Sequence, residues 1–171
     1  MDNNHFLIST KISNIDVGWV QQAFGHEDMY WAQELPKEHI ELLLSKSITL
    51  GLYKITSPSS DDKVSTSDEP KEKLQQIGMA RFMTDFVTCA YLSDVYIERE
   101  YRGDGIGKWL VGCCKEVENS IPYLRRGFLL TDPDVGKKFY GRELGYNDIH
   151  DEYDHVVMMT RKTWKFASES E

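Results

Sequence analysis

The stretch from Arg102 to Lys108 carries the residue types best suited to chemistry, because three glycines alternate there between an arginine and a lysine. Glycine lets the backbone turn tightly and approach a ligand closely. A strand-like run precedes the stretch and an amphipathic helical pattern follows it at once. Free N–H groups and the positive end of the helix dipole would then point at one spot, which suits a phosphate group. The alternative is a tight turn that binds nothing, and the arginine-led triple glycine favours the phosphate site.

Two better-known phosphate loops are excluded by single positions. A Walker A loop requires Ser or Thr after Gly-Lys, and here Trp109 follows Lys108. A dinucleotide-binding fingerprint requires a glycine at position 108, which is the same lysine. A nucleotide-phosphate protein that uses this turn in another way stays open as an alternative function.

The turn resembles the acetyl-CoA signature R-x-x-G-x-G of the GNAT superfamily of N-acetyltransferases, which Arg102, Gly105 and Gly107 match in place. The segment 139–146 (FYGRELGY) is similar to a second motif of that family. A bacterial and fungal subgroup without an assigned substrate resembles the chain further, at residues 30–32, 84–86 and 90–95. The resemblance covers about residues 6–161, and the departures are a longer segment at 56–74 and the sequence of residues 131–134.

The resemblance implies that acetyl-CoA is the co-substrate. Its pyrophosphate would lie on the backbone amides of the turn, and its pantetheine arm would pair with the preceding strand as if it were another strand. A backbone N–H near residue 96 or 97 would polarise the thioester carbonyl. The implied cofactor-binding residues are Val95, Tyr96, Ile97, Arg102, Gly103, Asp104, Gly105, Ile106, Gly107 and Lys108.

Acetyl transfer to an amine requires a base for the proton of the amine and a proton donor for the departing thiolate. Tyr140 stands where the family carries its general acid, and the alternative is a core aromatic residue with its hydroxyl at the edge. Asp94 lies in the strand that would hold the thioester, so its carboxylate is a candidate base. The alternative for Asp94 is a salt bridge or a contact with nearby backbone.

The candidate residues on the acceptor side are Tyr30, Trp31, Thr84 and Asp85. Tyr30 and Trp31 could equally anchor the connection between two helices. Glu27 and Asp28 could attract a cationic amine or could simply be solvated. We find no His, Cys, Asp or Glu residues at spacings typical of a metal site, so no metal is expected.

The periodicity of apolar residues predicts a mixed α/β fold with element order βααβββαβαβ. The resemblance adds that the central sheet is mostly antiparallel, splayed at one strand and flanked by helices. Asn14 is expected to cap the first helix and Pro36 to open the second. Strands are expected at 6–10, 48–55, 76–84, 89–98, 128–131 and 156–160, and further helices at 105–119 and 136–144, the last closed by Gly145.

The composition limits the setting of this site. The 171 residues predict one acetyltransferase domain over 1–171, with a flexible loop insertion at 56–74 and a frayed tail at 166–171. A net charge of −8 argues against nucleic-acid binding and mildly favours a cationic acceptor. No apolar run approaches the ~20 residues of a membrane span. The start lacks the pattern of a secretory signal, and three cysteines make no disulfide framework, so a cytoplasmic location is expected, with the nucleus as the alternative.

The sequence therefore predicts an N-acetyltransferase that passes acetyl from acetyl-CoA directly to a primary amine of a small molecule or peptide. Transfer would take place in a ternary complex, by positioning and polarisation. The alternative is a CoA-binding sensor, or a degenerate family member that does not catalyse. Whether the chain forms a homodimer is left open.

Overall fold

The computed structural model describes residues 5–56 and 73–161. The chain divides into two compact units, Met1–Thr131 and Asp132–Glu171, and each is described by itself. The tail predicted at 166–171 and most of the loop predicted at 56–74 lie outside the described residues. At the margins of that loop the prediction was wrong, because Thr56 pairs with Lys73 and Ile55 with Leu74 as strand residues.

A five-stranded sheet forms the centre of the first unit, with the strands in chain order from one edge to the other. The first four strands run antiparallel and the fifth runs parallel to the fourth. This arrangement confirms the mixed, mostly antiparallel sheet expected from the sequence. The strands are β1 (Phe6–Ser9), β2 (Ile48–Thr56), β3 (Lys73–Thr84), β4 (Cys89–Ile97) and β5 (Arg126–Leu129).

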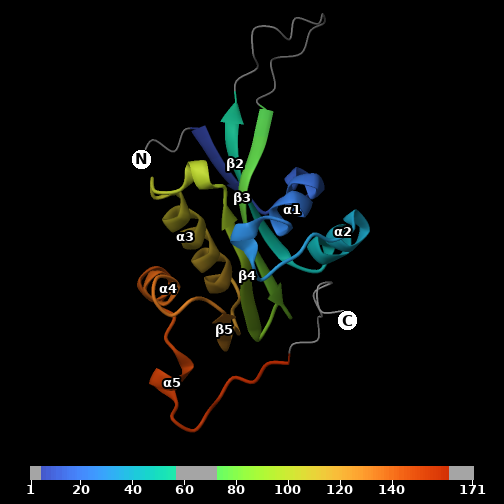
Figure 1. Cartoon of the computed structure of the whole chain (residues 1–171). Helices are drawn as coiled ribbons and strands as arrows, with labels where there is room; N and C mark the ends of the chain where they lie inside the picture. Colours follow the sequence, from blue (N-terminus) through green and yellow to red (C-terminus); the bar gives the residue numbers. More distant parts are fainter. Residues whose placement is uncertain (1–4, 57–72, 162–171) are drawn as a thin grey trace, which may run out of the picture. The chain divides into compact units, whose positions relative to one another are not determined.

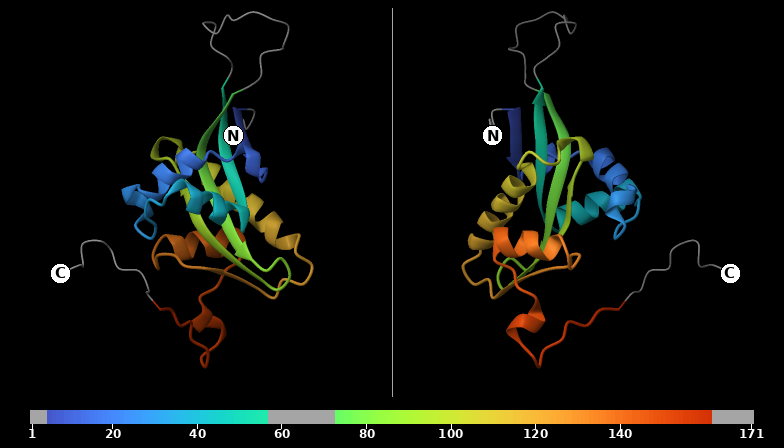
Figure 2. Two further views of the ribbon diagram at one scale, coloured as in Figure 1. Left: turned by 90° about the vertical axis from the view of Figure 1, so that its right-hand side faces the viewer. Right: turned by 60° about the vertical axis from the view of Figure 1, so that its left-hand side comes forward.

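Helices α1 (Val17–Phe24) and α2 (Lys37–Ser45) cover one face of this sheet, and α3 (Ile106–Asn119) covers the other (Figures 1 and 2). The cap of α1 is Asp16, whose carboxylate accepts a hydrogen bond from the backbone N–H of Trp19. The cap predicted at Asn14 was wrong, because that residue belongs to a short 3-10 turn at Ile12–Asn14. The core between α1, α2 and the sheet consists of buried apolar and aromatic residues, among them Val20, Phe24, Met29, Ile40, Leu44, Tyr53, Met79 and Tyr96.

The second unit contains α4 (Gly136–Leu144) and the short α5 (Ile149–Glu152). Asp132 lies in the turn before α4, and its carboxylate accepts hydrogen bonds from the backbone N–H groups of Asp134, Val135 and Gly136. The helix ends at Gly145, whose φ of 81° lies in the left-handed region, as the sequence predicted. Lys137 forms ion pairs with the carboxylates of Asp148 and Asp151, which joins α4 to α5 within this unit.

The strand predicted at 156–160 was wrong. These residues are described, and they belong to neither a helix nor a strand. Val157 and Met159, which would share one face of a strand, are 66% and 87% exposed, and Met158 on the other face is 47% exposed. A run with high β-propensity forms a strand only where a neighbouring strand and a packing surface support it.

Candidate active site

The glycine turn stands between β4 and α3, after a 3-10 turn at Arg99–Tyr101. Gly103 and Gly105 have φ values of 101° and 81°, in the left-handed region where a side chain costs roughly 1–2 kcal/mol. Gly105 is the N-cap of α3 and, as a glycine, has no side chain that could accept hydrogen bonds from the start of the helix. The helix start, with the positive end of the helix dipole, is therefore suited to an anion.

Gly107 lies in the first turn of α3, and the fold does not require glycine there. A Cβ atom at this position would lie 3.7 Å from Ile97 Cδ1, which is ordinary van der Waals contact, and its φ is not in the left-handed region. A glycine that packing does not demand is typical of a place where a ligand approaches the backbone.

Strand β4 separates from β5 part of the way along its length. Cys89 to Leu92 pair with Arg126 to Leu129, and beyond Leu92 no strand of the described residues pairs with this edge. The register against β3 shifts, so that Met79 pairs with Tyr96 while Arg81 pairs with Ser93. Asp94, with a φ of 50°, lies in this β-bulge. A bulge bends a strand and increases its twist, which is the physical cause of the predicted splay.

The open edge of β4 exposes backbone groups of alternate residues. Glu98 donates its backbone N–H to Ile77 O of β3, so the backbone groups of Ile97 and Val95 point to the opposite edge. Tyr96 pairs with Met79, and its side chain is buried under α1. Of the three strand residues predicted to bind pantetheine, Val95 and Ile97 therefore face the open edge.

The side chain of Arg102 is directed away from the turn. Its Nε donates to Ile97 O at 2.7 Å and its Nη2 to Asp28 Oδ2 at 2.8 Å. Arg99 donates to Asp28 Oδ2 through Nε at 2.9 Å and to Glu27 Oε1 through Nη2 at 2.7 Å. Arg99 and then Arg102 hold the pKa of the Asp28 carboxyl well below its usual range. Both guanidinium groups are thus paired with carboxylates of the 3-10 turn Glu27–Met29.

Asp94 forms a buried ion pair. Arg81 Nε and Nη2 lie 2.7 and 2.6 Å from Asp94 Oδ2, and Ser93 Oγ lies 3.1 Å from Asp94 Oδ1. Arg81 and Asp94 are each 7% exposed. The salt bridge that the sequence left open as the alternative to a base is therefore present, and both carboxylate oxygens have partners.

The other predicted residues lie in three places. Tyr140 is half-buried on α4 of the second unit, with its ring edge-on to Phe139 at 5.2 Å between centroids. Tyr30 and Trp31 pack edge to face at 5.0 Å and are 73% and 45% exposed. Thr84 lies with Asp85 at the hairpin between β3 and β4, at the other end of β4 from the glycine turn.

The polar atoms of Thr84 and Asp85 close that hairpin. The Asp85 carboxylate accepts from the Thr88 hydroxyl and from the backbone N–H groups of Val87, Thr88 and Cys89. These hydrogen bonds, that of the Thr88 hydroxyl first, lower the pKa of Asp85 well below its usual range. The structure therefore does not bring this pair together with the glycine turn.

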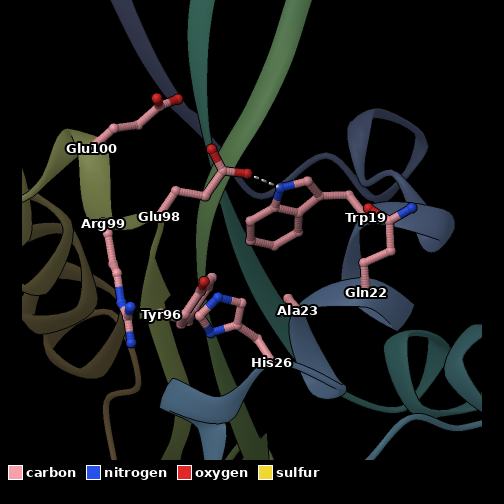
Figure 3. Close-up of a pocket in the computed structure, with 8 residues that line it drawn as sticks. All are labelled: Trp19, Gln22, Ala23, His26, Tyr96, Glu98, Arg99 and Glu100. Atoms are coloured by element: carbon pink, nitrogen blue, oxygen red, sulfur yellow. Dashed lines mark hydrogen bonds between the residues drawn. The ribbon is translucent and has the colours of Figure 1, made fainter.

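A pocket of about 380 Å³ lies between α1 and the end of β4 (Figure 3). Glu98 Oε1 accepts a hydrogen bond from Trp19 Nε1 at 2.6 Å. The imidazole of His26 lies 5.7 Å from the ring of Tyr96, and its Nδ1 accepts the backbone N–H of Asp28. The lining residues are Trp19, Gln22, Ala23, His26, Tyr96, Glu98, Arg99 and Glu100.

Sequence reasoning missed most of this pocket. Trp19 fell on the apolar face of a helix and Glu98 at the end of a strand, so neither stood out as a functional residue. One signal was present, because Tyr96 and Glu98 are two residues apart in a strand and therefore share a face. The 79-residue separation of Trp19 and Glu98 left no local pattern that would join them.

Comparison with known proteins identifies the class. The model of the acetyltransferase (GNAT) family matches residues 64–146. A candidate acetyltransferase of Gibberella zeae is 34% identical over 146 residues, which are 85% of this chain and 81% of that protein. The chain therefore belongs to the GNAT family of acetyltransferases and is an acyltransferase.

Solved structures agree with this assignment. A candidate GNAT-family acetyltransferase from Xanthomonas campestris superposes with a TM-score of 0.66 at 25% identity, over 92% of this chain and 93% of that one. Glucosamine-6-phosphate N-acetyltransferase from Arabidopsis thaliana shares the fold, with a TM-score of 0.53 at 11% identity, over 92% of this chain and 98% of its own.

None of the helices in residues 5–56 and 73–161 is long and apolar enough to cross a membrane. Within the same ranges, no three His, Cys, Asp or Glu side chains are grouped so that they could hold a metal ion.

Proposed function

We propose that the protein transfers the acetyl group of acetyl-CoA directly to a primary amine of a small molecule or peptide, in a ternary complex. One observation carries the proposal. The open edge of β4 beyond Leu92 leads into a glycine turn and then into a helix whose N-cap residue is a glycine. A strand edge is suited to the amides of an extended ligand, and a helix start is suited to its phosphates.

The backbone supplies most of the proposed cofactor contacts. Val95 and Ile97 would pair with the pantetheine arm, and the amides of residues 102–108 would hold the pyrophosphate. The N–H of Ile97 faces the open edge, where it would polarise the thioester carbonyl and stabilise the oxyanion that forms on attack. Because the guanidinium of Arg102 is paired with Asp28, the backbone carries the main attraction for phosphate.

The reaction needs two proton transfers. The neutral amine attacks the thioester carbon, the new C–N bond forms, and the C–S bond breaks as the electron pair leaves on sulfur. Tyr140 would donate a proton to the departing thiolate. Since Arg81 occupies the carboxylate of Asp94, we assign Asp94 to holding the bulge, and the amine would lose its proton through water.

The broader setting belongs to the same proposal. The residues 1–171 would act as one acetyltransferase domain. The cysteines Cys89, Cys113 and Cys114 are all free thiols, which agrees with a reducing compartment such as the cytoplasm. The net charge of −8 agrees with an amine acceptor and not with nucleic acid.

Replacing Tyr140 by Phe distinguishes an enzyme from a CoA-binding sensor. The wild-type protein should acetylate at least one amine, and Tyr140→Phe should lower kcat by about a hundredfold or more, as expected for loss of a general acid. Its Kd for CoA, measured by calorimetry, should stay unchanged. A wild-type protein that binds acetyl-CoA without acetylating amino acids, polyamines or peptides would support the sensor instead.

A further inference from the structure

The pocket beside α1 combines negative charge with aromatic walls. The carboxylate of Glu98 is held in place by Trp19 Nε1 at 2.6 Å, and the rings of Trp19 and Tyr96 lie 6.0 Å apart (Figure 3). Carboxylates and aromatic faces both attract organic cations. The pocket is therefore built for the positively charged part of a ligand.

The one guanidinium in the wall does not cancel this preference. Arg99 is paired with Glu27 and Asp28, so its charge is already offset by the 3-10 turn before α2. Arg102, which lies over the ring of Tyr96, is likewise paired with Asp28. The carboxylates of Glu98 and Glu100 remain as the excess charge of the pocket, and an anionic ligand would be repelled by them.

Glu98 lies close to the proposed reacting centre. It directly follows Ile97, whose backbone N–H would polarise the thioester carbonyl, and it lines the pocket. A short aliphatic chain would therefore join an amine at the thioester to a second amine at the Glu98 carboxylate. The volume of about 380 Å³ is large enough for a ligand of this kind.

We propose that the acceptor is an aliphatic diamine, of which one amine is acetylated while the second stays protonated and binds in this pocket against Glu98. This inference rests on the proposed acetyl transfer, because it names the substrate class of the same site. Glu98 binds the substrate in this account, and Trp19 positions its carboxylate.

The test compares 1,4-diaminobutane with butylamine, which has the same chain and lacks the second ammonium group. Since a hydrogen bond to a charged group is worth about 1.5–3 kcal/mol, wild-type kcat/KM should favour the diamine by at least about tenfold. Glu98→Gln should lower that preference to about twofold or less, mainly through KM for the diamine. Glu41→Gln, an exposed position on α2, is the matched control and should keep the wild-type preference.

Four results would contradict the inference. Wild-type protein that acetylates butylamine as well as the diamine would overturn it, and so would a Glu98→Gln variant that keeps the wild-type preference for the diamine. Wild-type protein that acetylates other amines and neither of these two would refute the diamine and keep the acetyl transfer. Acetyl-CoA that binds and acetylates no amine at all would refute both.

Discussion

Replacing Gly107 by alanine separates the ligand-binding role of the glycine turn from its role in folding. The new Cβ would lie 3.7 Å from Ile97 Cδ1, which needs no rearrangement. Alanine is favoured over glycine within a helix by roughly 0.5–1 kcal/mol. The free energy of unfolding of Gly107→Ala should therefore be unchanged or higher by up to about that amount.

The affinity for CoA should change in the opposite direction. The proposed pyrophosphate lies against the backbone at this position, so a methyl group would displace it from at least one N–H donor. A hydrogen bond to a charged group is worth about 1.5–3 kcal/mol, which corresponds to a Kd raised about tenfold to a hundredfold.

Calorimetric titration with CoA and urea denaturation measure the two quantities on the same samples. Gly112→Ala is the matched control, because it lies in the same helix and its Cβ would meet open space. Both variants should be as stable as the wild type or more stable, and Gly107→Ala alone should bind CoA weakly. A Gly107→Ala variant that binds CoA with wild-type affinity would refute the assignment of the turn as the pyrophosphate site. If Gly112→Ala weakened CoA binding equally, the helix and not the site would have changed.

Four further outcomes follow from the contacts. Asp94→Asn leaves Arg81 buried without its anion, so the free energy of unfolding in urea should fall by about 3–5 kcal/mol; a stable variant that has lost turnover would instead make Asp94 the base. Tyr53→Phe removes a hydroxyl that is buried without a hydrogen-bond partner among the described residues and whose pKa burial raises to about 12. Its melting temperature should therefore be equal or higher, and a clear fall would reveal a partner. Asp85→Asn should destabilise the protein at neutral pH, because hydrogen bonds lower the pKa of Asp85 in the folded state. That stabilisation is present above the unfolded pKa of about 3.9 and is lost as the pH falls through lower values, so the two proteins should converge in stability at acid pH; a constant difference would contradict this cause. Asp28→Asn should loosen Arg99 and Arg102, which we expect to raise the salt sensitivity of CoA binding in calorimetry; an unchanged salt dependence would show that the pairing does not affect the turn.

The sequence predicted those parts of the site whose residues follow one another in the chain. The strand, the turn and the amphipathic helix from Cys89 to Asn119 form one continuous pattern, and the left-handed φ values of Gly103 and Gly105 explain two of its glycines. The end of α4 at Gly145 was predictable for the same reason, since a C-cap glycine acts locally.

The parts that sequence missed depend on partners far apart in the chain. Arg102 meets Asp28 across 74 residues and Trp19 meets Glu98 across 79. Neither pair has a spacing that a single sequence displays. The strand expected at 156–160 failed for a related reason, because local β-propensity does not supply the neighbour that a strand needs. The cap of α1 was predicted at Asn14 and lies at Asp16, because both residue types suit a cap and they stand two residues apart.

Isotope-labelled acetyl-CoA tests the central claim most directly. The protein is incubated with labelled acetyl-CoA and primary amines that include 1,4-diaminobutane, and mass spectrometry follows the label while a thiol reagent follows free CoA. We expect one labelled acetyl group on the amine for each CoA thiol released, with no labelled protein at any time. Label on the protein would contradict direct transfer, and bound acetyl-CoA that yields no acetylated amine would contradict the proposed function itself.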